Sequence, residues 1–239
     1  MKKVDVLAFG AHPDDVELSA AGTLSKMSAA GKVIGIADLT AGELGSRGSA
    51  PLRLREAEAA AKIMGVQYRE NLGLADGFFE VNEANLLKVI ESIRRYQPEV
   101  VLANAINDRH PDHGRGSDLV SRACFLSGLR RINTQSEGVE QKEWRPKAVY
   151  HYIQDYWIKP DFVVDITHFM KVKMASIQAY SSQFFDPNSK EPKTPISGHS
   201  FLDFIESRAR HFGRPSGAEF GEGFTVERPP LAEDLTSIS

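Results

Sequence analysis

A single cysteine, Cys124, occurs among the 239 residues, which excludes an internal disulfide and fits a reducing compartment such as the cytoplasm. Long apolar runs are equally scarce, because no stretch approaches the ~20 apolar residues that a membrane-spanning helix needs. The apolar run after Lys2 and Lys3 ends within about six residues in a charged cluster, so it predicts a strand and not a secretory signal. We therefore expect a cytoplasmic protein that is not bound to a membrane.

Two further absences narrow the classes of ligand. Lys and Arg do not gather into a basic block, and the net charge is −3 with a pI near 6.2, so nothing in the composition indicates nucleic acid binding. The loops that carry polar clusters lack G-x-G-x-x-G, the glycine pattern typical of a dinucleotide site. The remaining composition, with 41% hydrophobic and 26% charged residues, is typical of a globular chain with enough apolar side chains for a core.

Strand-like and helix-like segments alternate through the first half of the chain. Strands are predicted at 4–9, 32–39 and 99–105, with a weaker one near 68–72, and helices at 16–30, 51–64, 83–96 and 117–129. This order predicts a Rossmann-like α/β fold, a mostly parallel sheet with helices on both faces. After about residue 135 the expected elements are strands at 147–153 and 162–166 and helices at 170–181 and 201–211. No linker or repeat divides the chain, so we expect one domain over residues 1–239.

Polar side chains are concentrated in two loops that follow predicted strands. The first loop, within FGAHPDDVELSAAG, contains His12, Asp14 and Asp15. The second, NAINDRHPDHGRG, lies about a hundred residues later and contains Asp108, His110, Asp112 and His113. In a doubly wound sheet the first and fourth strands are often neighbours at the switch point, where ligands bind outside the carboxyl ends of the strands. The two loops are therefore expected to bring imidazoles and carboxylates to one crevice.

Each motif taken alone also has a structural explanation. Acidic residues in PDD suit the N-terminus of a helix, and HPDH can form a turn. Their convergence favours a metal site instead. Imidazole and carboxylate ligands without thiolate suit Zn²⁺, or another first-row divalent ion such as Fe²⁺, better than Mg²⁺ or Ca²⁺. A catalytic zinc takes three protein ligands and leaves a position for water, so the surplus acids and imidazoles are available for proton transfer.

The paired motifs AHPDD and HPDH resemble the signature of the LmbE-like (PIG-L) family of zinc-dependent N-acetylglucosaminide deacetylases. Further similarity in RLREAEAAAKIMGV, NLGLADG, QAYSSQF and FGEGF extends the resemblance along nearly the whole chain. The chain is similar in particular to the bacillithiol-biosynthesis branch, which deacetylates N-acetylglucosaminyl malate. One departure is ADGFFE, where the family pattern has an arginine-containing turn after the Asp.

The resemblance selects among the surplus ligands, a choice that spacing alone leaves open. It implies that His12, Asp15 and His113 hold the metal. Asp14 is then the general base that takes a proton during attack of zinc-bound water on the N-acetyl group.

The second motif supplies two more groups in the same pattern. His110 would protonate the leaving amine or stabilise the oxyanion, and Asp112 would orient an imidazole. The resemblance also implies a homo-oligomer, with a hexamer as the expected state.

Arg53 and Arg109 are the predicted substrate contacts. Arg53 falls in the first turn of a predicted helix, where a cation opposes the helix dipole and calls for a compensating anion. A malate carboxylate would match the bidentate fork of an arginine. A salt bridge to Glu56 or Glu43 is the structural alternative.

The sequence thus predicts a zinc-dependent amide hydrolase that removes acetyl from an N-acetylglucosamine conjugate, with N-acetylglucosaminyl malate as the first expectation. One alternative is a deacetylase of another conjugate such as diacetylchitobiose. Another is a non-catalytic metal- or sugar-binding protein on the same fold, against which the spare acid Asp14 argues, since a binder needs ligands but no base. Arg47 and Arg55 are expected to be solvated or structural, and Cys124 is expected to lie in the core.

Overall fold

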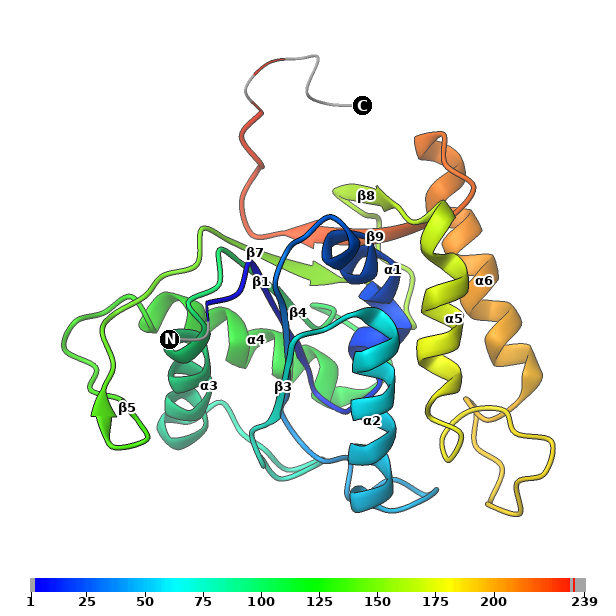
Figure 1. Cartoon of the computed structure of the whole chain (residues 1–239), viewed down its shortest axis with the longest axis horizontal. Coiled ribbons are helices and arrows are strands. Elements are labelled where there is room, and N and C mark those ends of the chain that lie inside the picture. The colour runs from blue at the N-terminus through cyan, green and yellow to red at the C-terminus, as the bar shows by residue number, and fades with distance from the viewer. Residues whose placement is uncertain (1–2, 233, 235–239) are drawn as a thin grey trace.

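Strand β1 (Val6–Gly10) is completely buried and lies third in the order of a seven-stranded sheet (Figure 1). The computed structural model describes residues 3–232 and 234 and orders the strands β3-β2-β1-β4-β7-β9-β8. The other strands of this sheet are β2 (Ile34–Asp38), β3 (Tyr68–Asn71), β4 (Val100–Ala103), β7 (Ala148–Tyr152), β8 (Phe162–Asp165) and β9 (Gly221–Val226). The pairs β1–β2, β2–β3, β1–β4 and β4–β7 are parallel, and β9 is antiparallel to both of its neighbours. The predicted mostly parallel sheet is confirmed.

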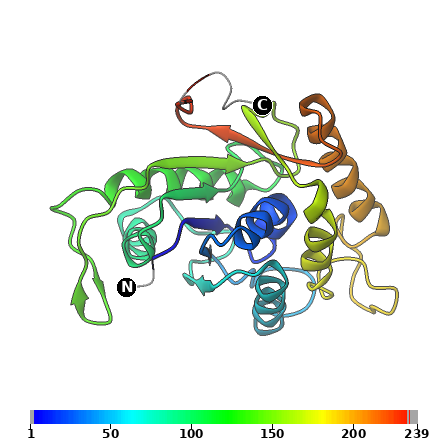
Figure 2. The same ribbon diagram turned by 45° about the horizontal axis from the view of Figure 1, so that its top comes forward.

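Helices cover both faces of this sheet (Figure 2). They are α1 (Asp15–Ala29), α2 (Ala50–Met64), α3 (Glu83–Tyr96), α4 (Pro111–Leu126), α5 (Met170–Gln178) and α6 (His199–Gly213), with short 3-10 turns at Thr167–Phe169 and Arg214–Ser216. Successive residues of a strand point to opposite faces. Accordingly, Leu7 and Phe9 pack with α3 and α4, whereas Val6 and Ala8 pack with α1. None of the described helices combines the length and apolarity that a membrane crossing requires.

The boundaries of α2 and α3 follow local signals in the sequence. The Ser49 hydroxyl accepts a hydrogen bond from the Leu52 amide, and α2 ends at Gly65 in the left-handed conformation with φ 71°. The Asn82 side chain accepts from the Asn85 amide at the start of α3. Such caps satisfy amide groups that have no partner within the helix. These helices therefore lie close to the predicted ranges.

Helix α4 begins at Pro111, six residues before the predicted start at Ser117. Proline suits a first helical turn because its missing N–H would be unpaired there, and the His110 ring accepts from the Asp112 amide as the N-terminal cap. The two glycines of HGRG favoured a loop at this point. Asp112 and His113 therefore lie on the first turn of α4, which holds both side chains on a rigid element.

Strand β9 and the small hairpin of β5 (Gln135–Ser136) and β6 (Val139–Glu140) were not predicted. Glycine is depleted in strands, and β9 contains Gly221 and Gly223. A Cβ at position 221 would lie 2.5 Å from Val163 Cγ1 and 2.9 Å from the backbone nitrogen of Gly213, so glycine is required where this strand meets β8 and the end of α6. The sequence signal for β9 is therefore weak because the packing needs the residue that propensity disfavours.

Candidate active site

The carboxyl ends of β1 and β4 lie side by side, and the two polar loops meet there. These strands pair in parallel with Val6 opposite Val100. Asn104, directly after β4, joins the loops, because its Oδ1 accepts from the Ala11 amide at 2.9 Å and its Nδ2 donates to Asp15 Oδ2 at 3.0 Å. The structure therefore brings the two motifs together as expected from the order of the strands.

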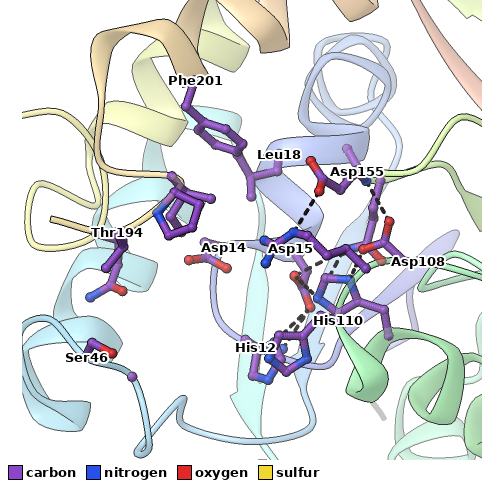
Figure 3. A pocket seen from close by; sticks show the side chains of 18 of the residues that line it. His12, Asp14, Asp15, Leu18, Ser46, Asp108, His110, Asp155, Thr194 and Phe201 are labelled. Atoms are coloured by element: carbon purple, nitrogen blue, oxygen red, sulfur yellow. Dashed lines mark hydrogen bonds and ion pairs between the residues drawn. The ribbon is translucent and has the colours of Figure 1, made fainter.

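A crevice of about 510 Å³ opens over this junction (Figure 3). Its size lies within the usual range of about 300–1,000 Å³ for small-molecule sites. Seven of the eight predicted site residues line it: His12, Asp14, Asp15, Arg53, Arg109, His110 and His113. The eighth, Asp112, is completely buried. Apolar side chains, among them Leu18 and Phe201, also line the crevice.

The carboxylate of Asp15 links the three predicted metal ligands. Asp15 Oδ1 lies 3.0 Å from His113 Nε2, and Asp15 Oδ2 lies 3.5 Å from His12 Nδ1. All three side chains are buried. Two imidazoles thus turn one nitrogen each toward an oxygen of the same carboxylate, and such nitrogen and oxygen donors are ligands that would hold Zn²⁺.

The other nitrogen of each imidazole contacts a second carboxylate. His12 Nε2 lies 3.1 Å from Asp76 Oδ1, and His113 Nδ1 lies 2.5 Å from Asp108 Oδ2. A metal-binding histidine commonly has such a carboxylate behind it, which sets the tautomer and the orientation of the ring. Asp112, to which the resemblance assigned an orienting role, lies 3.4 Å from His12 Nε2.

Sequence reasoning did not assign roles to Asp76 and Asp108, or to Gln154. Gln154 Nε2 donates to Asp15 Oδ1 at 3.1 Å. Asp76 comes from the loop after β3 and lies in NLGLADG, and Asp108 lies two residues before His110. The sequence therefore offered two weak signals for these roles. Asp76 lies in a stretch of family similarity, and Asp108 lies next to HPDH.

The electrostatics of this centre favour positive charge. Burial by itself lowers the pKa of His113, but the carboxylates of Asp15 and Asp108 outweigh it and raise the pKa to about 9. Burial likewise opposes the charged form of His12, yet its carboxylate neighbours raise its pKa well above the ordinary value. A divalent cation can replace these protons, because metal binding displaces protons from its ligands.

The donor set therefore fits a divalent metal ion. Within the described residues, the triplets whose donor atoms all lie within 4.8 Å of one another are His12, His110 and His113, and His12, Asp76 and Asp112. The predicted set shares His12 and His113 with the first of these triplets. The His110 ring lies with its centroid 4.6 Å from that of His12. Burial and the neighbouring imidazoles lower the pKa of His110. The charged form of His110 is thus disfavoured, unlike the charged forms of His12 and His113.

Asp14 stands apart from this cluster although it is the neighbour of Asp15. Its backbone has φ 129°, a conformation that L-residues rarely adopt and that costs on the order of 1–3 kcal/mol. Arg53 Nη2 contacts Asp14 Oδ2 at 2.6 Å. Burial nevertheless raises the pKa of Asp14 to about 6, against the lowering effect of Arg53. The side chains of Asp14 and Asp15 therefore contact different partners, Arg53 and the two imidazoles. Their pKa values also differ, because that of Asp14 is raised and that of Asp15 is lowered.

The structural alternative for Arg53, a salt bridge to Glu56 or Glu43, is wrong, because the ionic partner of Arg53 is Asp14. Glu56 accepts from the Ser182 amide at 2.8 Å and Glu43 from the Asp76 amide at 2.9 Å, so both are engaged elsewhere. The two carboxylates that could have neutralised the charge of Arg53 within or near its own helix thus accept hydrogen bonds from other groups. Arg53 lines the crevice and joins α2 to the loop that carries Asp14.

Three other arginines line the same crevice, namely Arg47, Arg109 and Arg208. Arg109 is 47% exposed and pairs with Asp155 at 2.8 Å, at the rim. Arg208, from α6, donates to the main-chain carbonyls of Leu18, at 2.7 Å, and Gln154. Sequence reasoning did not select Arg208, because α6 is about a hundred residues from HPDH and carries no motif.

The PIG-L family model, described as GlcNAc-PI de-N-acetylase, matches residues 7–124. This range contains both polar motifs. A diacetylchitobiose deacetylase from Thermococcus kodakarensis is 26% identical over 230 residues, which cover 91% of this chain and 81% of that relative. A 4-oxalmesaconate hydratase from Pseudomonas putida is 29% identical over 198 residues, covering 74% of this chain and 73% of the hydratase.

A solved structure of a conserved protein from Thermus thermophilus superimposes with a TM-score of 0.86 at 33% sequence identity. The match covers 97% of this chain and 98% of that one. The similarity therefore includes the second half of the chain, beyond the part that carries the two motifs.

Proposed function

This chain belongs to the PIG-L family, and we propose that it is a metal-dependent hydrolase that removes the N-acetyl group from a small N-acetylglucosamine conjugate. One observation carries the proposal. A buried cluster of His12, Asp15 and His113 shares a crevice with a separate buried acid, Asp14. A binding protein would need the cluster but not the additional acid.

Diacetylchitobiose is the first substrate to test. The Thermococcus relative, which is named for this substrate, matches 91% of the chain and supports the alternative given above better than N-acetylglucosaminyl malate. A crevice of about 510 Å³ has room for a disaccharide-sized ligand. The malate conjugate is kept as the second candidate on the strength of the motif resemblance and of the arginines that line the crevice.

His12, Asp15 and His113 would hold the metal ion, with Zn²⁺ as the first candidate and Fe²⁺ as the second. When bound, such an ion lowers the pKa of water to about 7 and polarises a carbonyl group. Asp76 and Asp108 would keep the two imidazoles in the orientation and tautomer that ligation needs.

Side chains of this protein carry out the proton transfers of the reaction. Asp14, oriented by Arg53, takes a proton from the water that attacks the acetyl carbon. The carbon–nitrogen bond then breaks, acetate leaves, and the amine nitrogen gains a proton. Asp14 can return the proton that it took from the water to the amine nitrogen, and His110, which lines the same crevice, would donate a hydrogen bond to the oxyanion.

Acetate release should depend completely on a bound metal. We expect the purified protein to release acetate from diacetylchitobiose or N-acetylglucosaminyl malate, to lose this activity on chelation, and to regain it with Zn²⁺ or Fe²⁺. The measurement is an acetate assay on both conjugates and on free N-acetylglucosamine, with metal content determined in parallel. Full turnover by metal-free protein would contradict the site, and hydration of 4-oxalmesaconate without any acetate release would make the chain a hydratase.

Replacement of the two predicted substrate contacts should separate their roles. Arg109→Ala removes an exposed cation at the rim and is expected to lower turnover of the malate conjugate about tenfold more than that of neutral diacetylchitobiose, because a charge-assisted contact is typically worth about 1.5–3 kcal/mol. Arg53→Ala is expected to slow both substrates, since Arg53 orients Asp14. An equal loss on both substrates in Arg109→Ala would exclude a contact with an acidic group.

A further inference from the structure

Arg47 connects two segments that are about 140 residues apart in the chain. It comes from the loop between β2 and α2 and is only 6% exposed. Its guanidinium donates from Nε to the Ser182 carbonyl at 2.7 Å, from Nη1 to the Pro192 carbonyl at 2.9 Å, and from Nη2 to Ser189 Oγ at 2.9 Å. All three acceptors lie in the segment between α5 and α6, and all three are neutral.

Further hydrogen bonds join the same parts of the chain near Ser182. Gln183 Nε2 donates back to the Arg47 carbonyl at 2.9 Å. Glu56, on α2, accepts from the amide and the hydroxyl of Ser182 at 2.8 and 2.6 Å. Ser182 is therefore anchored by α2 as well as by Arg47. Ser189 and Pro192, by contrast, are held to the loop between β2 and α2 by Arg47. Most of residues 185–193 are exposed, so little side-chain packing replaces that tether.

The tethered segments form one wall of the crevice. Ser46 precedes Arg47, and Thr194, Pro195 and Ile196 follow Pro192 closely; all four line the crevice. Figure 3 shows Ser46 and Thr194 on one side of the crevice and His110 and Asp108 on the other, with Asp14 between them in this view. The wall thus faces the part of a bound molecule that lies away from the reacting amide.

We propose that Arg47 is a positioning residue that holds this wall in place and sets the affinity for the non-reacting part of the substrate. The inference rests on the proposed function for the nature of that substrate, a conjugate larger than N-acetylglucosamine itself. The guanidinium of Arg47 is engaged by the segment after α5 and not by Asp14 or the metal cluster, so its effect falls on binding and not on the bond-breaking step. Lysine cannot replace it, because only the planar fork of arginine reaches three acceptors in fixed directions.

Arg47→Gln is expected to raise KM for diacetylchitobiose about tenfold, equivalent to about 1.4 kcal/mol, with kcat unchanged. Free N-acetylglucosamine, which does not reach the wall, should keep its kcat/KM. Ser189→Ala removes only the Nη2 acceptor and should have a smaller effect in the same direction. Arg55→Gln is the matched control, since Arg55 is an exposed arginine on α2 and its loss should change neither constant.

Limited proteolysis gives a readout that is independent of activity. Lys190 and Lys193 are exposed within the tethered segment, so trypsin should cleave there several-fold faster in Arg47→Gln than in the unsubstituted protein or in Arg55→Gln. Equal losses of kcat/KM on both substrates, or unchanged cleavage at these lysines, would overturn the inference. If the unsubstituted protein released no acetate from any conjugate, the proposed function would fail, and the cleavage rates alone would decide whether Arg47 holds the wall.

Discussion

Asp14→Asn is expected to lower kcat for acetate release by about 10²–10⁴, or roughly 3–5 kcal/mol of barrier, while the metal content stays unchanged. Asparagine keeps the shape of the side chain and still accepts the hydrogen bond that Arg53 Nη2 donates to this position. It cannot take a proton from water at neutral pH. Asparagine also tolerates positive φ better than most residues, which matters because Asp14 has φ 129°.

The measurements are kcat, KM and metal stoichiometry on the purified variant. Asp118→Asn, at an exposed acid paired with Arg122 on α4, controls for the loss of one negative charge. Near-normal kcat in Asp14→Asn would remove the general-base role. Loss of metal in that variant would place Asp14 among the ligands instead.

Asp15→Ala is expected to abolish both metal binding and turnover. Asp15 is the carboxylate that both His12 and His113 face, at 3.5 and 3.0 Å, so its removal takes away one of three protein ligands. Substitution of a partner behind a ligand already weakens metal affinity by about 10–100-fold, and loss of the ligand itself should exceed that. Metal affinity, determined by titration of the metal-free protein, tests this directly.

Two further variants make the Asp15 result interpretable. Asp15→Asn preserves the shape of the side chain and keeps one of the two oxygens that accept hydrogen bonds from Asn104 and Gln154, so thermal unfolding of this variant shows whether a loss of metal reflects a loss of fold. Asp108→Asn acts behind His113 and should give the smaller, roughly 10–100-fold effect. If metal remained bound in Asp15→Ala and disappeared in Asp14→Asn, the roles of the two acids would be reversed.

Local signals explain why the fold class could be predicted. Apolar runs that end in polar loops mark β1, β2 and β4, and capping residues such as Ser49 and Asn82 mark the helices between them. The alternation of these elements implies a parallel sheet, which is confirmed. The one-domain organisation over residues 1–239 and the homo-oligomeric state stay predictions.

The convergence of the two motifs was also predictable, because a general rule places the carboxyl ends of neighbouring parallel strands at one edge. That rule needs only the order of the strands. Family membership follows from the same residues, since AHPDD and HPDH carry the resemblance and the match extends over residues 7–124. The substrate did not follow from them, because the motifs surround the reacting amide and not the rest of the conjugate.

By itself, then, the sequence determined the α/β fold, the meeting of His12, Asp15 and His113 at one sheet edge, and the family. Only the tertiary structure decided that Arg53 pairs with Asp14, that Asp76 and Asp108 lie behind the two imidazoles, and that Arg47 is buried against the segment after α5. The physical reason is the range of the interactions. Strands, caps and motif spacing are encoded by neighbouring residues, whereas the partner of a charged side chain depends on which distant loops the packing brings within about 3 Å.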